Sequence, residues 1–227
     1  MQSILYLRGV GHETPAFFDL PEAGNIKAKL PRELEPSDFD DYKAILIPSH
    51  INQRALIPFA PFMERFLNRG GVLVFNGHLV YPVIPGLSSF VPAQGGRLED
   101  LIVERVNNHP IFEGVNVDDL SFRRGVAGFY GRGSNPPPSG ALILHRLKKD
   151  GSVIDWVWHR PEGGVIFMHT GNPMWMFVND DTSAARIAPR LLVWVNTLLG
   201  NSMDDIKRLM PARPLCDGKC AQKRMCC

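Results

Sequence analysis

Cysteine is missing from the first 215 residues of this 227-residue chain. All four cysteines lie near its end, at Cys216, Cys220, Cys226 and Cys227. Disulfide bonds therefore do not hold the body of the chain together, and no thiol is available there as a nucleophile. The spacing of the four thiols differs from the Cys-x2-Cys pairs of common zinc sites. A flexible, oxidation-prone tail and a metal-binding or disulfide-bonded tail stay open as alternatives.

Long apolar runs and a large excess of one charge are also missing. No run of about 18 apolar residues predicts a membrane-spanning helix. The formal net charge of +2 gives no reason to expect nucleic acid or an acidic membrane as a partner. Residues 1–8 lack the basic region and cleavage motif of a secretory signal and favour a first strand. We therefore expect a cytoplasmic protein with no nucleic-acid or membrane partner.

The stretch 70–78 (GGVLVFNGH) is the most informative part of the chain. Two glycines predict the end of a helix, and four apolar residues predict a short buried strand. A polar tip follows the strand and consists of Asn76, Gly77 and His78. In a doubly wound sheet, such a tip commonly carries a nucleophile or a ligand contact. Neither cysteine nor serine occupies it here.

Other short apolar runs alternate with helical patterns along the chain. The predicted strands are 4–7, 26–30, 44–47, 72–75, 101–106, 141–145, 152–158 and 165–168, and the predicted helices are 14–20, 52–69 and 184–198. This alternation predicts an α/β fold with a doubly wound, mostly parallel sheet. The unbroken apolar strands favour burial on both faces, whereas the lysines of 26–30 favour an edge strand.

The remaining segments are less regular. Residues 125–140 contain five glycines and three consecutive prolines, which predicts a loop over the site. Residues 1–200 are predicted to form one α/β domain. Residues 201–227 are basic, contain the cysteines and show no periodicity, so we expect a flexible tail.

Four stretches carry a family resemblance through their order and spacing, although each is loose alone. They are 40–47 (DDYKAILI), 66–74 (FLNRGGVLV), 109–114 (HPIFEG) and 163–172 (GGVIFMHTGN). Together they span roughly residues 4–199. With them the chain resembles the class I glutamine amidotransferase-like superfamily, and most of all its trehalose-utilisation (ThuA-like) branch.

The resemblance implies a flavodoxin-like sheet with helices on both faces. In the amidotransferase members of the superfamily, a cysteine follows the strand equivalent to 72–75 and a histidine follows the last strand. Here Gly77 and His78 stand where the cysteine is expected, while His169 lies close to the histidine position. Glutaminase chemistry needs the thiol to form its covalent intermediate. We therefore expect a member without glutaminase activity.

Four of the seven histidines follow predicted buried strands, and parallel strands place such tips along one edge. These histidines are His12, His50, His78 and His169. We predict a crevice with His78 and His169 as candidate catalytic residues. The candidate ligand-binding residues are His12, Glu13, His50, Asn76, Gly77 and Asn172, with Ser49 beside them.

Three interpretations of this crevice remain open: a polar rim without function, a pocket for a small polar ligand such as a sugar, and a metal or acid–base centre. The pattern requires no cofactor, and a divalent metal stays an alternative. Trp156, Trp158 and Trp175 either offer a sugar-stacking face or belong to the core. The leading hypothesis is binding of a small polar ligand or a partner protein. A hydrolase or carbohydrate-active enzyme, and a homo-oligomer, are the alternatives.

Overall fold

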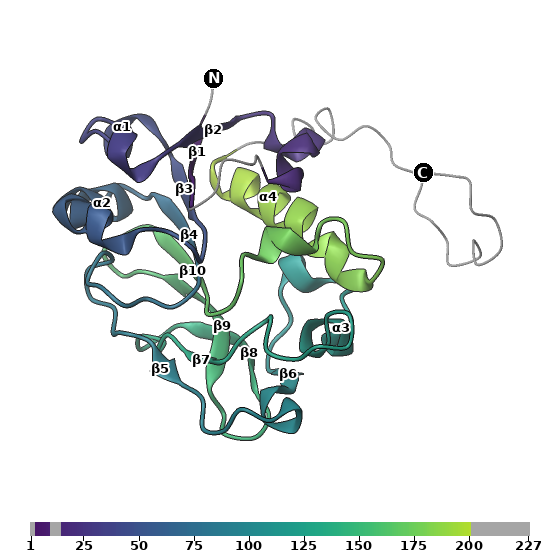
Figure 1. Cartoon of the computed structure of the whole chain (residues 1–227). Coiled ribbons are helices and arrows are strands. Elements are labelled where there is room, and N and C mark those ends of the chain that lie inside the picture. Colours follow the sequence, from purple (N-terminus) through teal and green to yellow (C-terminus); the bar gives the residue numbers. More distant parts are fainter. Residues whose placement is uncertain (1–2, 10–14, 201–227) are drawn as a thin grey trace.

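An eight-stranded sheet runs through the part of the chain that the computed structural model describes, residues 3–9 and 15–200 (Figure 1). Its strands are β1 (Ile4–Leu7), β2 (Ile26–Lys29), β3 (Ala44–Ile47), β4 (Val72–Asn76), β6 (Val103–Arg105), β8 (Leu142–Leu147), β9 (Val153–His159) and β10 (Val165–His169). They lie in the order β2-β1-β3-β4-β10-β9-β8-β6.

Two halves make up this sheet. Strands β2, β1, β3, β4 and β10 are parallel neighbours, whereas β9, β8 and β6 extend the sheet with antiparallel pairs. The parallel half has the strand order of flavodoxin-like folds. The predicted α/β, flavodoxin-like, mostly parallel sheet is thus confirmed. So is the edge strand, because β2 with its two lysines ends the sheet.

Helices cover both faces of the parallel strands. Figure 1 shows α1 (Asp38–Asp41) and α2 (Ala60–Asn68) on one side and α4 (Ile187–Leu198) on the other; α3 (Val117–Ser121) is a further short helix. Alternate residues of the strands belong to two separate hydrophobic cores, one on each face of the sheet. Leu46 lies in the core that includes α4, and its neighbour Ile45 lies in the core that includes α2. This two-sided burial explains why the strand sequences are continuously apolar.

The helix predicted over 14–20 is wrong. The structure has two 3₁₀ turns there, η1 (Ala16–Asp19) and η2 (Pro21–Ala23). Leu20 precedes Pro21 and has an extended backbone with φ −72° and ψ 139°, the conformation that a residue before proline prefers, so the first turn ends after four residues. The other 3₁₀ turns are η3 (Pro31–Glu33), η4 (Gln53–Phe59), η5 (Leu98–Leu101), η6 (Pro110–Phe112), η7 (Met174–Phe177) and η8 (Ser183–Arg186).

The two glycines of the 70–78 stretch end α2 as predicted. Gly70 has a φ of 91°, and its N–H donates to the carbonyl of Leu67 over 2.8 Å. The N–H of Gly71 donates to the carbonyl of Phe66 over 3.0 Å. These two bonds form a Schellman motif, which satisfies the last helix carbonyls and turns the chain directly into β4.

The glycine-rich segment 125–140 packs onto the sheet. Its short strand β7 (Gly133–Ser134) pairs with β5 (Val91–Pro92), and the hydroxyl of Thr170 donates to the carbonyl of Gly133 over 3.0 Å. Tyr130, in the middle of the segment, is almost fully buried. The predicted tail, 201–227, lies outside the described residues. Within the described part, no helix is long and apolar enough to cross a membrane.

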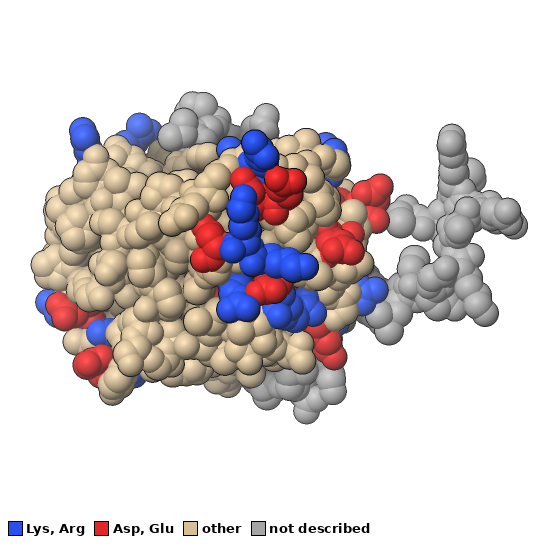
Figure 2. All heavy atoms as spheres, turned by 90° about the horizontal axis from the view of Figure 1, so that it is seen from below, with Lys and Arg blue, Asp and Glu red and all other residues tan. Residues whose placement is uncertain are grey.

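Charged side chains of both signs lie side by side on the face seen from below (Figure 2). Ion pairs of the described chain include Lys149 with Asp100, Arg146 with Glu104, and Arg97 with Glu99. Because acidic and basic groups are interspersed in that view, the visible face has a mixed charge and not one dominant sign.

The α2–β4 junction makes a direct stability prediction. Gly70→Ala places a side chain at positive φ with nothing within 4 Å, and should lower the free energy of unfolding by about 1–2 kcal/mol. Gly71→Ala should cost more, because its Cβ would lie 2.6 Å from both the carbonyl oxygen and the ring of Phe66. Urea unfolding measures both. Equal costs would contradict this account of the junction.

Candidate functional site

The carboxyl ends of three parallel strands meet in register at one edge of the sheet. Ile47 of β3 pairs with Phe75 of β4, and Asn76 at the end of β4 pairs with His169 at the end of β10. Gly77 extends the ladder, since its N–H donates to the carbonyl of His169 over 2.8 Å. The residues that follow the three strands therefore emerge next to one another.

A cavity of about 390 Å³ opens at these strand ends, and its volume suits a small molecule. We call it the strand-tip cavity. Its walls come from the β3 tip and η4, from the β4 tip, from the glycine-rich segment and from the β10 tip. The lining residues are Ser49, His50, Gln53, Gly77, His78, Val80, Gly128, Phe129, Arg132, Thr170, Gly171 and Asn172.

Five of the residues predicted from the sequence line the strand-tip cavity together, namely Ser49, His50, Gly77, His78 and Asn172. They come from the ends of β3, β4 and β10. These residues therefore share one crevice, as expected for the tips of neighbouring parallel strands.

The other predicted residues lie elsewhere. Asn76 and His169 are fully buried and do not line the cavity. His12 and Glu13 lie outside the described residues. The two candidate catalytic residues are thus not brought to one cavity, because the ring of His169 lies in the buried network described below.

Gly77 allows the tips of β3 and β4 to approach closely. Its φ is 101°, and a Cβ there would lie 2.6 Å from the Cα of Ser49, so a larger residue would push the tips apart. The hydroxyl oxygen of Ser49 is buried and has no hydrogen-bond partner within the described chain. A buried hydroxyl without a partner is costly, and this one belongs to a residue that lines the cavity.

Arg132 and His78 both line the strand-tip cavity, and the charge of Arg132 acts on the His78 imidazole. Partial burial, and then the positive charge of Arg132, lower the pKa of His78 from its ordinary 6.5. The His78 ring also stacks on Phe90 with their centroids 3.6 Å apart. Burial and the charge of Arg132 both favour the neutral form of this imidazole.

Asn76 joins two strands and the turn that follows β10. Its side-chain amide donates to the carbonyl of Ile47 over 3.2 Å and accepts from the N–H of Met174 over 3.0 Å. Both hydrogen bonds are buried. This amide thus positions the strand tips, although it was predicted as a ligand contact.

A buried carboxylate, Asp155, lies in the centre of a polar network that includes His169 at the end of β10. Its Oδ1 is 2.5 Å from Nδ1 of His169, and its Oδ2 is 2.8 Å from Nδ1 of His145. The hydroxyl of Tyr130 donates to the same Oδ2 over 2.5 Å. All four side chains are almost fully buried. We call these four residues the Asp155 network.

Hydrogen bonding keeps Asp155 ionised despite its burial. Burial alone would raise its pKa, but the electrostatic attraction of His169 and the hydrogen bonds from both imidazoles outweigh burial and lower the pKa to about 2. Burial and the charge of Asp155 raise the pKa of Tyr130 well above its ordinary value. Tyr130 is therefore a permanent donor.

The two histidines of the Asp155 network differ in the hydrogen bonding of their Nε2 atoms. Nε2 of His145 accepts from the guanidinium of Arg105 over 3.3 Å, so the ring N–H that faces Asp155 is the one on Nδ1. Nε2 of His169 is buried and has no hydrogen-bond partner in the described chain. Gly171 lies directly beside it, since a Cβ on Gly171 would approach this nitrogen to 2.7 Å.

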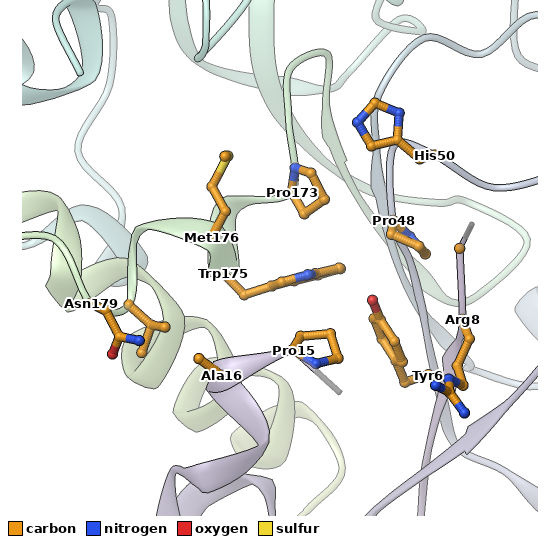
Figure 3. A pocket seen from close by; sticks show the side chains of 12 residues that line it. Tyr6, Arg8, Pro15, Ala16, Pro48, His50, Pro173, Trp175, Met176 and Asn179 are labelled. Atoms are coloured by element: carbon orange, nitrogen blue, oxygen red, sulfur yellow. The ribbon is translucent and has the colours of Figure 1, made fainter. Parts of the chain in front are cut away.

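A second cavity of about 310 Å³ lies at the ends of β1 and β3, where the strand order reverses. Figure 3 shows Trp175 and Tyr6 close to one another among its lining residues, with His50 on the side of Pro48. His50 also lines the strand-tip cavity. Of the tryptophans predicted as a sugar-stacking face, Trp175 lines this second cavity. Trp156 is fully buried in the core.

Sequence reasoning missed Arg132 and most of the Asp155 network. Arg132 lies in a segment predicted only as a loop, and its distance in sequence from the strand tips hides its position. Asp155 did leave a signal, because it is a charged residue between Ile154 and Trp156 in an otherwise apolar strand. Among the described residues, no three His, Cys, Asp or Glu side chains are grouped so as to hold a metal ion.

Comparisons with known proteins give a likeness of fold. No protein-family model and no curated protein matches the sequence. A cytoplasmic protein from Salmonella typhimurium aligns with a TM-score of 0.54 and 15% identity, over 87% of this chain and 98% of that one. PurLQS from Thermotoga maritima aligns with a TM-score of 0.51 and 14% identity, over 86% and 100%.

The N-terminal domain of IFT52 also aligns, with a TM-score of 0.51 and 11% identity, over 86% of this chain and 97% of that domain. At such identities the likenesses concern the fold alone. They agree with the flavodoxin-like α/β architecture and with the fold that the superfamily resemblance implies.

Replacing Arg132 should change the titration of His78. Arg132→Gln removes the positive charge that disfavours the imidazolium, so the pKa of His78 should rise. It should stay below 6.5, because burial is the larger cause of its depression. An NMR titration of the His78 ring measures this, with Arg97→Gln as the control. An unchanged pKa in Arg132→Gln would contradict the proximity of the two groups.

Removing the buried charge should destabilise the whole chain. Asp155→Asn leaves three donors with a weaker acceptor and should cost about 3–5 kcal/mol at pH 7. Because the folded pKa of about 2 lies below the ordinary 3.8, protonation of Asp155 should remove part of this stabilisation from the wild type as the pH falls from about 4 to about 2.

Urea unfolding at several pH values tests this linkage. Asp155→Asn should show a shallower loss of stability in the acid range. The control is Glu162→Gln, whose side chain is 61% exposed and which should stay within about 0.5 kcal/mol of the wild type. A variant as stable as the wild type at pH 7 would refute the central role of Asp155.

Proposed function

We propose that this chain binds a small polar ligand in the strand-tip cavity and lacks glutaminase activity. One observation carries the proposal: a cavity of about 390 Å³ at the carboxyl ends of β3, β4 and β10, with the unpaired hydroxyl of Ser49 in its wall. Ligands of α/β sheets bind at this edge. Convergent polar groups in such a cavity provide orientation and specificity.

The superfamily resemblance supports the proposal that the chain lacks glutaminase activity. In the amidotransferase members of the superfamily that this chain resembles, which also includes the ThuA-like branch, the nucleophilic cysteine follows the strand that corresponds to β4. Here Gly77 and His78 occupy this tip, and no thiol stands in residues 1–215. Without a thiol, no thioester with glutamine can form. A cytoplasmic location and membership of this superfamily are part of the same proposal.

A second candidate function is acid–base catalysis by His169. The pairing of its Nδ1 with a buried carboxylate, together with a free Nε2, is the arrangement that makes a histidine a good general base. Two observations weigh against it. His169 is fully buried, and no serine, threonine or cysteine of the described chain hydrogen-bonds to Nε2. Ligand binding is therefore the better supported function.

A thermal-shift screen tests the proposal. Sugars, polyols, amino acids and small organic acids are added singly to the full chain. A ligand present at about 100 times its Kd stabilises by about 2.7 kcal/mol, which should raise Tm by about 5–10 °C for a chain of this size.

Matched tryptophan variants tell cavity binding from binding elsewhere. Val80 lines the cavity and is 57% exposed, so Val80→Trp should narrow the cavity without disturbing the core and abolish the shift. Val106 is 40% exposed and does not line it, so Val106→Trp should keep the shift. A shift that survives in Val80→Trp, or ammonia release from glutamine by the wild type, would overturn the proposal.

A further inference from the structure

The strand-tip cavity contains a positive charge that no acidic side chain of its lining compensates. We propose that the ligand held there carries an oxyanion, a carboxylate or phosphate group, bound between Arg132 and Ser49. This inference rests on the proposed function, because it specifies the chemistry that the same cavity recognises.

The charge of Arg132 is available to a ligand. Its Nε donates to the carbonyl of Gly128 over 3.1 Å, and this contact orients the guanidinium without neutralising it. Within the described residues, no carboxylate lies within ion-pair distance of Arg132, and the cavity lining contains neither aspartate nor glutamate. A guanidinium is the side chain best matched to the paired oxygens of carboxylate and phosphate groups.

The backbone that carries Arg132 is held in place before any ligand arrives. The carbonyl of Arg132 accepts from the N–H of Ala93 over 2.9 Å. On its two sides, Gly133 accepts from Thr170 and Tyr130 donates to Asp155. A fixed wall reduces the ordering cost of binding.

Most polar groups that would recognise a neutral polyol are already engaged within the protein. The Gln53 amide donates to the carbonyl of His78 and accepts from the N–H of Val80. The Asn172 amide donates to the carbonyl of Phe129.

The groups that remain favour an anion. Ser49 has an unpaired hydroxyl, and a hydroxyl can donate to an oxyanion. His50 and His78 add imidazole N–H groups to the same lining. Two imidazoles, a hydroxyl and an unpaired guanidinium supply more donors than acceptors, which is the donor balance that a carboxylate or phosphate group requires.

Isothermal titration calorimetry at constant ionic strength, in a buffer free of phosphate and carboxylates, tests the inference. The probes are inorganic phosphate, succinate and the neutral disaccharide trehalose, each titrated into the full chain. Phosphate, succinate or both should bind saturably, and their relative affinities tell which oxyanion the cavity prefers. Arg132→Gln should weaken that binding by about tenfold or more, because a hydrogen bond to a charged group is lost. Ser49→Ala should weaken it less, and Arg97→Gln should leave it unchanged.

Each other outcome counts against a specific claim. Oxyanion binding that is equal in wild type and Arg132→Gln would overturn the inference, because the anion would then bind elsewhere. If trehalose is the only probe that binds, and Val80→Trp abolishes its binding, the inference of an oxyanion ligand is wrong and the proposed function stands. If none of the probes binds, the inference of an oxyanion ligand is wrong. The proposed function then fails only if the thermal-shift screen also finds no ligand whose effect is lost in Val80→Trp. Circular dichroism of each variant confirms that it folds.

Discussion

A single buried carboxylate, Asp155, connects the two halves of this molecule. It lies on β9 and contacts His145 on β8, His169 on β10 and Tyr130 in the glycine-rich segment. A buried charge is tolerated only when its oxygens are satisfied, and three donors satisfy this one. In addition to the hydrogen-bond ladders that join β8, β9 and β10, this one group links side chains of all three strands to the glycine-rich segment that lines the cavity.

The cavity depends on this connection. Tyr130 is two residues from Arg132, so anchoring the tyrosine to Asp155 also anchors the wall that carries the guanidinium. On the opposite side, the Asn76 amide joins β3, β4 and the start of η7, and Gly77 lets the two strand tips come close together. The walls are thus built from buried polar contacts of the protein with itself, which leaves the charge of Arg132 and the hydroxyl of Ser49 for a ligand.

Local sequence patterns were sufficient for much of the fold and part of the site. The apolar runs at 44–47, 72–75 and 165–168 predicted β3, β4 and β10, and the tip residues His50 and His78 followed from their place after such strands. Chain-distant contacts were not predictable. The pairing of Asp155 with His145 depends on a β-bulge between β8 and β9, and no spacing rule reveals it. The role of Asn76 likewise required knowing that Met174 lies against the β4 tip.

The most direct test of the account is a crystal structure of the full chain soaked in phosphate after growth without it. The account predicts phosphate in the strand-tip cavity, within hydrogen-bond distance of the Arg132 guanidinium and the Ser49 hydroxyl, with the Asp155 network intact. An empty cavity, one filled by the protein's own side chains, or phosphate bound only at other surfaces would contradict it.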